Sequence, residues 1–391
     1  MIGKNIRIIA ICIFIIPLLT ALASCGSAVS STSSSTTTSA NLFKRWESKT
    51  LASNMAFQQG INAVINGKNY LICNVIYGNS TSQKNMYATI AILDISRPDI
   101  PVEISSLQTG QDDKPYICNL KLNGSILYVL TIDHLWIIDV SAPNQPKNVG
   151  QIPLTGATNL EESGKYAFIM SVTQTNEQTI STFDLSNPLQ PLKIGQIVVP
   201  NTGIIQLEPS VSLLFVLTEN GLDVYDISIP ASLKQIGFLS NPFPPPTTMA
   251  TFFIPQYFFD MALHGNFLYI TVGINQLLVI DISDPSVPKI VHDLTTTKQG
   301  TTIIISGGTA YLLSYDGPMA FSTGSDSLLT AVDISTPSDP EELNTVPLPV
   351  PASAKLWESY GGMTEANNHL YFFDYDNPTI QIIDLSKSPW N

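Results

Sequence analysis

One short phrase recurs seven times along the chain, and it constrains the fold more than any other feature. In its clearest copy, residues 276–288 read Gln-Leu-Leu-Val-Ile-Asp-Ile-Ser-Asp-Pro-Ser-Val-Pro: an apolar run, an aspartate, a branched apolar residue, a serine and two prolines. The aspartates of the seven copies are Asp94, Asp139, Asp184, Asp226, Asp281, Asp333 and Asp384. Successive copies lie 42 to 55 residues apart. A period of this length, built from short strands, indicates an all-β, seven-bladed β-propeller with four antiparallel strands per blade.

The repeat also decides the domain organisation. A length of 391 residues by itself suggests two or three domains. Seven blades fill residues 42–391, however, so we expect a single propeller there and no further folded domain. Residues 1–24 are expected to be a signal peptide, and residues 25–41 a lipidated cysteine followed by a tether.

The N-terminal residues have the pattern of an export signal. Lys4 and Arg7 precede an apolar run over residues 8–19, which is too short to be a comfortable membrane span. Leu22-Ala23-Ser24-Cys25 then resembles the bacterial lipobox, whose cysteine is lipidated and becomes the mature N-terminus. Ordinary cleavage after Ser24 is the alternative. Lipidation of Cys25 predicts an extracytoplasmic protein that acyl chains anchor to the cell membrane or the outer membrane without crossing it.

A segment of low complexity follows the proposed lipid site. Eleven of the fifteen residues from Gly26 to Ala40 are Ser or Thr, and none is charged or aromatic. Such a segment cannot bury enough surface to fold, so it is predicted to be a flexible tether.

The charge of the chain argues against one class of partner. The formal net charge is −13, and an acidic domain repels phosphate backbones and anionic lipid. We therefore expect no nucleic-acid partner and no membrane contact beyond the lipid anchor.

Two cysteines remain once Cys12 and the proposed lipid site are set aside. Cys73 and Cys118 lie on strands expected in adjacent blades, and an even pair outside the cytoplasm permits a disulfide. Two buried small hydrophobes explain the pair equally well, and the prediction favours free thiols.

Each repeat carries a second signature before its aspartate: a turn and then a strand centred on one large residue. These residues are Leu71, Tyr128, Phe168, Phe215, Tyr269, Tyr311 and Tyr371. Their regular place suits packing between blades. Apolar runs such as residues 277–280 predict strands that are covered on both faces. The recurrent aspartates are expected to accept backbone amide bonds in the adjoining turn, away from the propeller axis.

The last repeat ends too early to complete its blade. Only five residues follow Ser386, whereas residues 42–47 stand alone before the first repeat. Residues 42–50 are therefore predicted to supply the outer strand of blade seven and to close the ring.

The phrases Leu-Val-Ile-Asp-Ile-Ser at residues 278–283 and Trp-Ile-Ile-Asp-Val-Ser at residues 136–141 resemble the LVIVD-repeat family of bacterial and archaeal secreted proteins. The resemblance covers residues 42–391 and implies a β-propeller outside the cell, with no general activity. Ile229-Pro230 departs from the family pattern because its proline falls one residue late.

A column of polar residues precedes the large residues by nine positions. It consists of Asn62, Asn119, Asn159, Gln206, Asp260, Thr302 and Gly362. Its six polar side chains are candidates to line the axial channel and bind a small polar ligand, a cation or water. In the structural alternative, which the prediction favours, they satisfy unpaired backbone groups at the inner edge of each blade.

One long excursion is unusually aromatic for a loop. It begins at Asn241 and includes Phe243, Phe252, Phe253 and Tyr257. These rings predict a partner-binding lip or a lid over the central opening. In the alternative, the loop folds onto its own blade and buries them.

Motifs of catalysis and cofactor binding are absent from the sequence. There is no His-Glu-x-x-His, Gly-x-Ser-x-Gly or phosphate-binding glycine loop, and His264 and His369 are expected to be solvated turn residues. The sequence therefore predicts a monomeric binding propeller without catalysis, metal or cofactor, whose ligand is a protein or glycan at the cell surface. The alternatives are a metal-assisted hydrolase or lyase that uses Asp260 as acid, base or ligand, and a purely structural surface protein.

Overall fold

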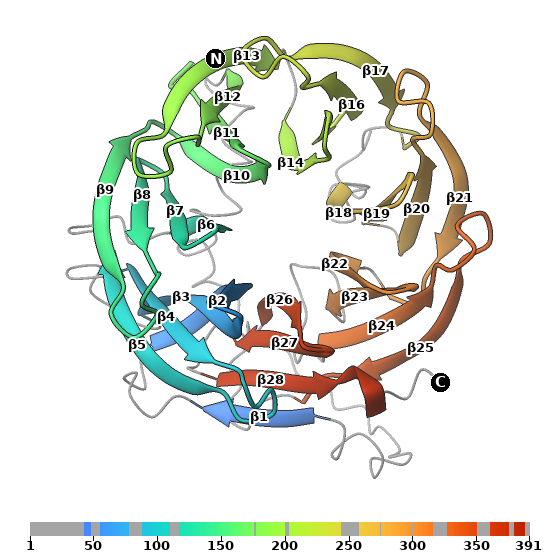
Figure 1. Ribbon diagram of the computed structural model, residues 1–391. Helices are drawn as coiled ribbons and strands as arrows, with labels where there is room; N and C mark the ends of the chain where they lie inside the picture. The colour runs from blue at the N-terminus through green and yellow to red at the C-terminus, as the bar shows by residue number, and fades with distance from the viewer. Residues whose placement is uncertain are drawn as a thin grey trace, which may run out of the picture.

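The computed structural model describes residues 43–47, 55–77, 88–109, 117–175, 177–199, 203–243, 258–273, 275–298, 300–315, 327–349, 360–374 and 379–387. These residues form seven four-stranded antiparallel sheets, arranged as blades around one axis (Figure 1). The all-β, seven-bladed propeller that the repeats predict is confirmed. The predicted signal peptide, the lipid site at Cys25 and the tether lie outside the described residues.

Strands are named in chain order, and blades are numbered from the first complete one. Blade 1 contains β2 (Met55–Ile65), β3 (Lys68–Tyr77), β4 (Ala88–Asp94) and β5 (Val102–Thr109). Blade 2 contains β6 (Ile117–Asn123), β7 (Ile126–Thr131), β8 (His134–Asp139) and β9 (Lys147–Pro153). Blade 3 contains β10 (Ala157–Ser163), β11 (Tyr166–Val172), β12 (Gln178–Asp184) and β13 (Leu192–Val199). Blade 4 contains β14 (Ile204–Pro209), β15 (Leu213–Thr218), β16 (Gly221–Asp226) and β17 (Lys234–Ser240).

The remaining three blades follow the same order from the axis outwards. Blade 5 contains β18 (Phe258–His264), β19 (Phe267–Val272), β20 (Gln276–Asp281) and β21 (Lys289–Thr295). Blade 6 contains β22 (Gly300–Ser306), β23 (Thr309–Tyr315), β24 (Ser327–Asp333) and β25 (Glu341–Pro347). Blade 7 contains β26 (Tyr360–Ala366), β27 (His369–Asp374), β28 (Thr379–Asp384) and, as its outer strand, β1 (Phe43–Glu47). A 3-10 turn, η2 (Leu385–Lys387), follows β28, and no helix within the described ranges is long and apolar enough to span a membrane.

The ring closes because blade 7 combines the first strand of the propeller with the last three. Strand β1 pairs antiparallel with β28, with Phe43 opposite Ile383 and Glu47 opposite Thr379. The predicted closing strand is thus confirmed, and it spans residues 43–47. Lys44 on β1 also forms an ion pair with Asp99 in a turn of blade 1, so the closing strand contacts both blades that meet there.

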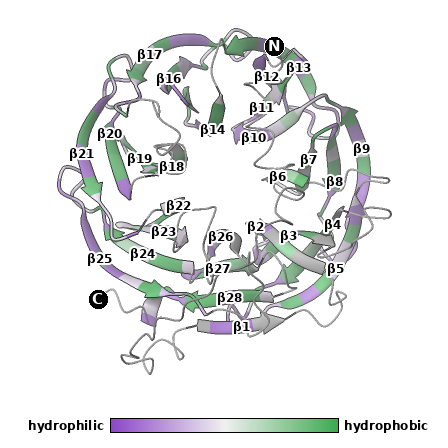
Figure 2. Cartoon of the chain, turned by 180° about the vertical axis from the view of Figure 1, so that it is seen from behind, coloured by the Kyte–Doolittle hydropathy of each residue, from purple (hydrophilic) through white to green (hydrophobic). Residues whose placement is uncertain are grey.

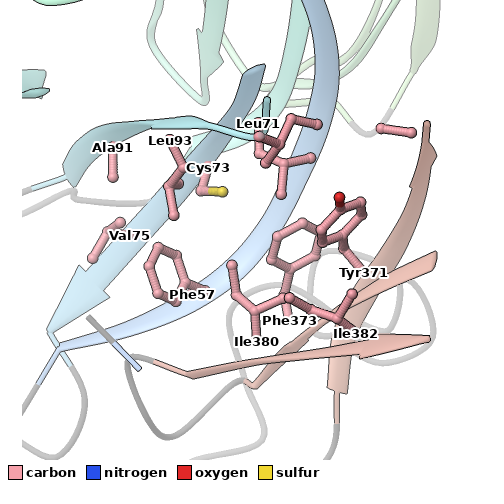
Figure 3. Close-up of a cluster of buried hydrophobic side chains, with 12 residues drawn as sticks. Phe57, Leu71, Cys73, Val75, Ala91, Leu93, Tyr371, Phe373, Ile380 and Ile382 are labelled. Atoms are coloured by element: carbon pink, nitrogen blue, oxygen red, sulfur yellow. The ribbon is translucent and has the colours of Figure 1, made fainter. Parts of the chain in front are cut away.

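Apolar side chains fill the interfaces between blades. Hydrophobic residues predominate along β27 and β28 (Figure 2), and every residue of β7 is buried. At the closing interface, Leu71 and Cys73 of blade 1 belong to the same buried cluster as Phe373 and Ile382 of blade 7 (Figure 3). A Cβ added to Gly60 would lie 2.4 Å from the ring of Phe373, so only glycine lets these two blades approach so closely.

The seven recurrent aspartates, here called the turn aspartates, all make the same local hydrogen bond. In each, a carboxylate oxygen accepts from the backbone N–H of the serine two residues later, at 2.7 to 3.0 Å. Hydrogen bonds from that serine hold the pKa of six of the carboxyls below the ordinary value. The pKa of Asp384 is lowered as well, first by Lys387 and then by Ser386. The predicted role of the aspartates in the turn is confirmed.

In blades 4 and 5, the turn after the aspartate packs closely on the outer strand of the preceding blade. A Cβ added to Gly195 would lie 2.5 Å from the carbonyl oxygen of Ala231, and one added to Gly237 would lie 2.1 Å from that of Pro285. Tyr128 donates to the carbonyl of Pro188 in the next blade at 2.8 Å. These contacts give the repeated serine-proline turn a role between blades as well as within its own blade.

Two smaller predictions have different outcomes. Cys73 and Cys118 do not form a disulfide, as the sequence favours, and they lie on β3 and β6 of adjacent blades. The expectation of a solvated His369 is wrong. Its side chain is only 12% exposed, with Nε2 at 3.4 Å from Asp99 and 3.9 Å from Asp384, because the ring closes around it.

Candidate functional site in the axial channel

The innermost strands place one residue per blade at a common level, directly after a β-bulge, and six of these seven residues are polar. This axial ring consists of Gln59, Asn119, Asn159, Gln206, Asp260, Thr302 and Gly362. Five of the six predicted polar residues are therefore in place. Asn62 is not, and Gln59 takes its position, because the hairpin between β2 and β3 is longer than those of the other blades. Counting back from Leu71 therefore missed the ring by three residues.

Several ring side chains bond to the next blade. Asn119 donates to Asn159 at 3.1 Å. Gln206 accepts from the backbone N–H of Met261 at 2.6 Å and donates to the carbonyl of the same residue at 3.2 Å. These contacts are the kind that the structural alternative predicted, with amide side chains satisfying neighbouring inner edges.

Asp260 is the one acid of the axial ring, and it bridges two strands. One carboxylate oxygen accepts from the N–H of Ile303 in blade 6 at 2.9 Å, and the other accepts from Met261 at 3.0 Å. Desolvation nevertheless raises the pKa of Asp260 to about 7, because burial outweighs the hydrogen bonds that lower it. The carboxyl therefore changes charge in the neutral range while holding blades 5 and 6 together.

A second level lies two residues further along the same strands, and there the blades differ. Blades 2, 3 and 4 carry the charged arc, defined as Lys121, Glu161 and Glu208. The other four blades carry Ile61, Ala262, Ile304 and Thr364 at the matching positions. If the propeller fold required a charged residue at this position, every blade would carry one. The charges of the arc therefore serve a purpose other than the fold.

Within the arc, one lysine faces several carboxylates. The Lys121 ammonium lies 2.5 Å from the Glu161 carboxylate, and the two side chains are 30% and 14% exposed. Burial still raises the pKa of Glu161, with Lys121 opposing the shift. Burial, followed by the charge of Glu161, raises the pKa of Glu208 to about 8.

The arc borders an open pocket between blades 2 and 3, with a volume of about 410 Å³. This charged pocket is lined by Lys121, Leu122, Asn123, Gly124, Glu161, Glu162 and Gly164. Burial raises the pKa of Glu162 to about 7, and one of its carboxylate oxygens is buried with no hydrogen-bond partner among the described residues. A buried polar atom left unpaired is costly, which distinguishes this pocket from the satisfied axial ring.

The remaining predicted site residues lie elsewhere or beyond the described ranges. Phe243 packs on the hydrophobic cluster that blades 4 and 5 share, as the alternative for its loop predicts. Phe252, Phe253 and Tyr257, the other members of the proposed partner loop, lie outside the described residues. Among the residues that are described, no three His, Cys, Asp or Glu side chains are grouped so that they could hold a metal ion.

The sequence contains a signal for the charged pocket that the predicted column did not use. Lys121 and Glu161 lie two residues after Asn119 and Asn159, on the same side of their strands. Comparing that position across the seven blades separates three charged residues from four uncharged ones. Glu162 is harder to find, because its importance depends on burial.

The fold and its channel define the class of this protein as a seven-bladed β-propeller. The family profile of the LVIVD repeat matches residues 116–152, 258–296 and 320–347. The chain therefore carries LVIVD repeats, as the phrases around Asp139 and Asp281 suggest. A search of curated proteins finds no match.

Solved structures share the fold at low sequence identity. Sqt1 from Chaetomium thermophilum aligns with a TM-score of 0.56 at 11% identity, over 85% of this chain and 97% of that one. A functionally unknown protein from Desulfotomaculum acetoxidans aligns with a TM-score of 0.52 at 13% identity, over 73% and 85% of the two chains. A protein from Lactobacillus plantarum gives 0.52 at 11% identity, over 73% and 83%. At these identities the likeness shows the fold alone.

Proposed function

We propose that this chain is a non-catalytic binding propeller outside the cytoplasm, anchored to a membrane by a lipid on Cys25, with a protein or a glycan as its ligand. The observation that carries the proposal is the charged pocket between blades 2 and 3. At the level of Lys121 and Glu161, charged residues occur only in blades 2, 3 and 4, and the other four blades carry uncharged residues there. Loops and open pockets on a rigid, repeated scaffold are where propellers place their binding groups.

The binding part of the proposal is tested with immobilised glycans and envelope proteins. The full chain is expected to retain a specific ligand, and the double substitution Glu161→Gln with Glu162→Gln is expected to reduce retention by about tenfold or more. Glu365→Gln is the matched control, because Glu365 occupies in blade 7 the position that Glu162 has in blade 3. Equal retention by all three proteins would remove the pocket from the account.

The anchoring part is tested separately in cells. Cys25→Ala is expected to move the protein from the membrane fraction to the soluble extracytoplasmic fraction, because its acyl chains would be absent. Fractionation that is the same with and without the substitution would contradict lipidation at this residue.

A second candidate function is an enzyme that uses the axial ring. The observation in its favour is the pKa of about 7 at Asp260, which suits general acid–base chemistry at neutral pH. Against it, both carboxylate oxygens of Asp260 already accept backbone hydrogen bonds. Cleavage of an envelope polysaccharide or ester by the full chain, abolished in Asp260→Asn, would favour the enzyme over the binding propeller.

A further inference from the structure

The charged pocket has an unequal number of cations and anions. Lys121 is held by Glu161 at 2.5 Å, whereas Glu162 has no cation of its own among the described residues. The charged and titratable groups that face Glu162 are Lys121 on β6, Tyr128 on β7 and Glu161 on β10. With the three ionic side chains charged, the pocket has a net charge of −1, which favours a singly charged cation.

The polar lining of the pocket narrows the class of that cation. Leu122 is its one apolar side chain, and the remaining lining comes from the ionic groups, Asn123 and two glycine turns. Both Gly124 and Gly164 have positive φ, and a Cβ added to either would meet no atom within 4 Å. The space beside both turns is therefore open to a ligand, while Asn123 Nδ2 donates to the carbonyl of Gly164 at 3.4 Å. A lysine side chain, with its long apolar stem, finds little to pack against in such a pocket.

We infer that the pocket binds an amino sugar, with a protonated amino group at Glu162 and ring hydroxyls at Asn123 and the glycine turns. This inference rests on the proposed function and specifies the ligand class of the same site. Asn123 hydrogen-bonds to the Glu162 side chain, and an ammonium group would supply a positive charge and a donor for the carboxylate oxygen that has no partner among the described residues. Charge-assisted hydrogen bonds are among the stronger ones. The pocket volume of about 410 Å³ suits one or two sugar rings.

Calorimetry with two matched oligosaccharides tests the inference on the full chain. A glucosamine tetramer is expected to bind saturably, and an N-acetylglucosamine tetramer of the same linkage is expected to bind at least about tenfold more weakly, since acetylation removes the charge. Glu162→Gln should weaken binding of the charged tetramer by about tenfold, and Glu365→Gln should leave it unchanged. Asn123→Ala provides a second pocket variant if Glu162→Gln unfolds, and it should weaken both tetramers.

Proton release gives a readout that a purely structural role of Glu162 would not change. An ammonium group favours the ionised carboxylate, so binding near neutral pH should release protons from Glu162 while the amine of the ligand takes protons up, and calorimetry in two buffers of different ionisation enthalpy measures the net exchange. The release from Glu162 is expected to disappear in Glu162→Gln. Equal binding of the two tetramers, or unchanged binding by Glu162→Gln, would overturn the inference.

Other ligands separate failure of the inference from failure of the proposed function. Binding of a lysine-rich peptide, with neither tetramer bound, would overturn the sugar assignment and leave a binding propeller with a protein ligand. Binding of a divalent cation alone at the pocket would also overturn the amino-sugar assignment. If no glycan or envelope protein binds the wild-type chain, the proposed function fails together with the inference.

Discussion

The turn aspartates and the axial carboxylates contain the same chemical group in opposite electrostatic settings. Each turn aspartate accepts hydrogen bonds beside its own strand end, and its pKa lies below the ordinary value. Glu162, Glu208 and Asp260 are desolvated near the axis, and their pKa values rise to about 7, 8 and 7. The first set occurs once in every blade, whereas the second is confined to blades 3, 4 and 5. The repeated group therefore builds the scaffold, and the unrepeated groups mark a place where the scaffold does something more.

The largest expected effect comes from removing the axial carboxyl that has most partners. Asp260→Ala should destabilise the protein by about 1–3 kcal/mol, because the N–H of Ile303 loses its acceptor, whereas the N–H of Met261 keeps its bond to Gln206. Asp260→Asn retains one acceptor oxygen and should cost less than half as much. Urea unfolding measures both, and a neutral Asp260→Ala would show that this carboxyl does not join the blades.

The two sets of carboxylates should also make stability depend on pH in opposite directions. The pKa of the Glu208 carboxyl is raised in the folded state. The stability that the protonated carboxyl contributes is therefore complete below pH 4.5, its ordinary pKa, and is lost as the pH rises through about 8. Glu208→Gln should therefore recover on the order of 2 kcal/mol at alkaline pH relative to the wild type, with little gain at pH 5. Thermal unfolding across this range measures the difference, and parallel curves for the two proteins would contradict the raised pKa.

The turn aspartates should show the reverse sign. Their lowered pKa values stabilise the fold above the ordinary value of 3.8, and this contribution is lost as pH falls below it. Asp94→Ala should cost about 1 kcal/mol at neutral pH, since the N–H of Ser96 loses its acceptor. Asp94→Asn keeps an acceptor and is the matched control. A cost for Asp94→Ala that persists below pH 3 would mean that the charge of the carboxylate is unimportant.

The smallest effect is expected at the exposed ion pair of the closing strand. Lys44 is 54% exposed and pairs with Asp99, so solvent screens most of the attraction. Lys44→Ala should change the free energy of unfolding by less than about 1 kcal/mol. A larger loss would show that the contact between β1 and blade 1 contributes to closure beyond the backbone pairing with β28.

Much of the scaffold could be predicted from the sequence, because repetition makes local rules visible. Seven copies of one phrase indicate the blades, and the early end after Ser386 indicates the closing strand. Wherever the hairpin has its usual length, the predicted ring residues occupy equivalent strand positions, and ligand binding by them stays a prediction. The predicted position failed at Asn62 because the longer hairpin of blade 1 shifts the register, which the position of Leu71 does not reveal.

The candidate site was less accessible to sequence reasoning because it depends on differences between blades. Lys121 and Glu161 read as ordinary surface charges until the structure brings them within 2.5 Å beside a pocket. Glu162 is a candidate because one of its carboxylate oxygens is buried without a hydrogen-bond partner among the described residues, and no pattern of residue types predicts such burial. His369 shows the same limit, since a turn position suggests solvent and ring closure buries it.

The most direct test of the contrast between the two carboxylate sets is a titration of the individual side chains by NMR, with carbon-13 at the carboxyl groups of Asp and Glu. The account predicts that Glu162 titrates near pH 7 and Glu208 near pH 8, while Asp94 and Asp139 titrate below the ordinary value of 3.8. If all four groups titrate together near pH 4, as in model peptides, the distinction between scaffold and site carboxylates is wrong.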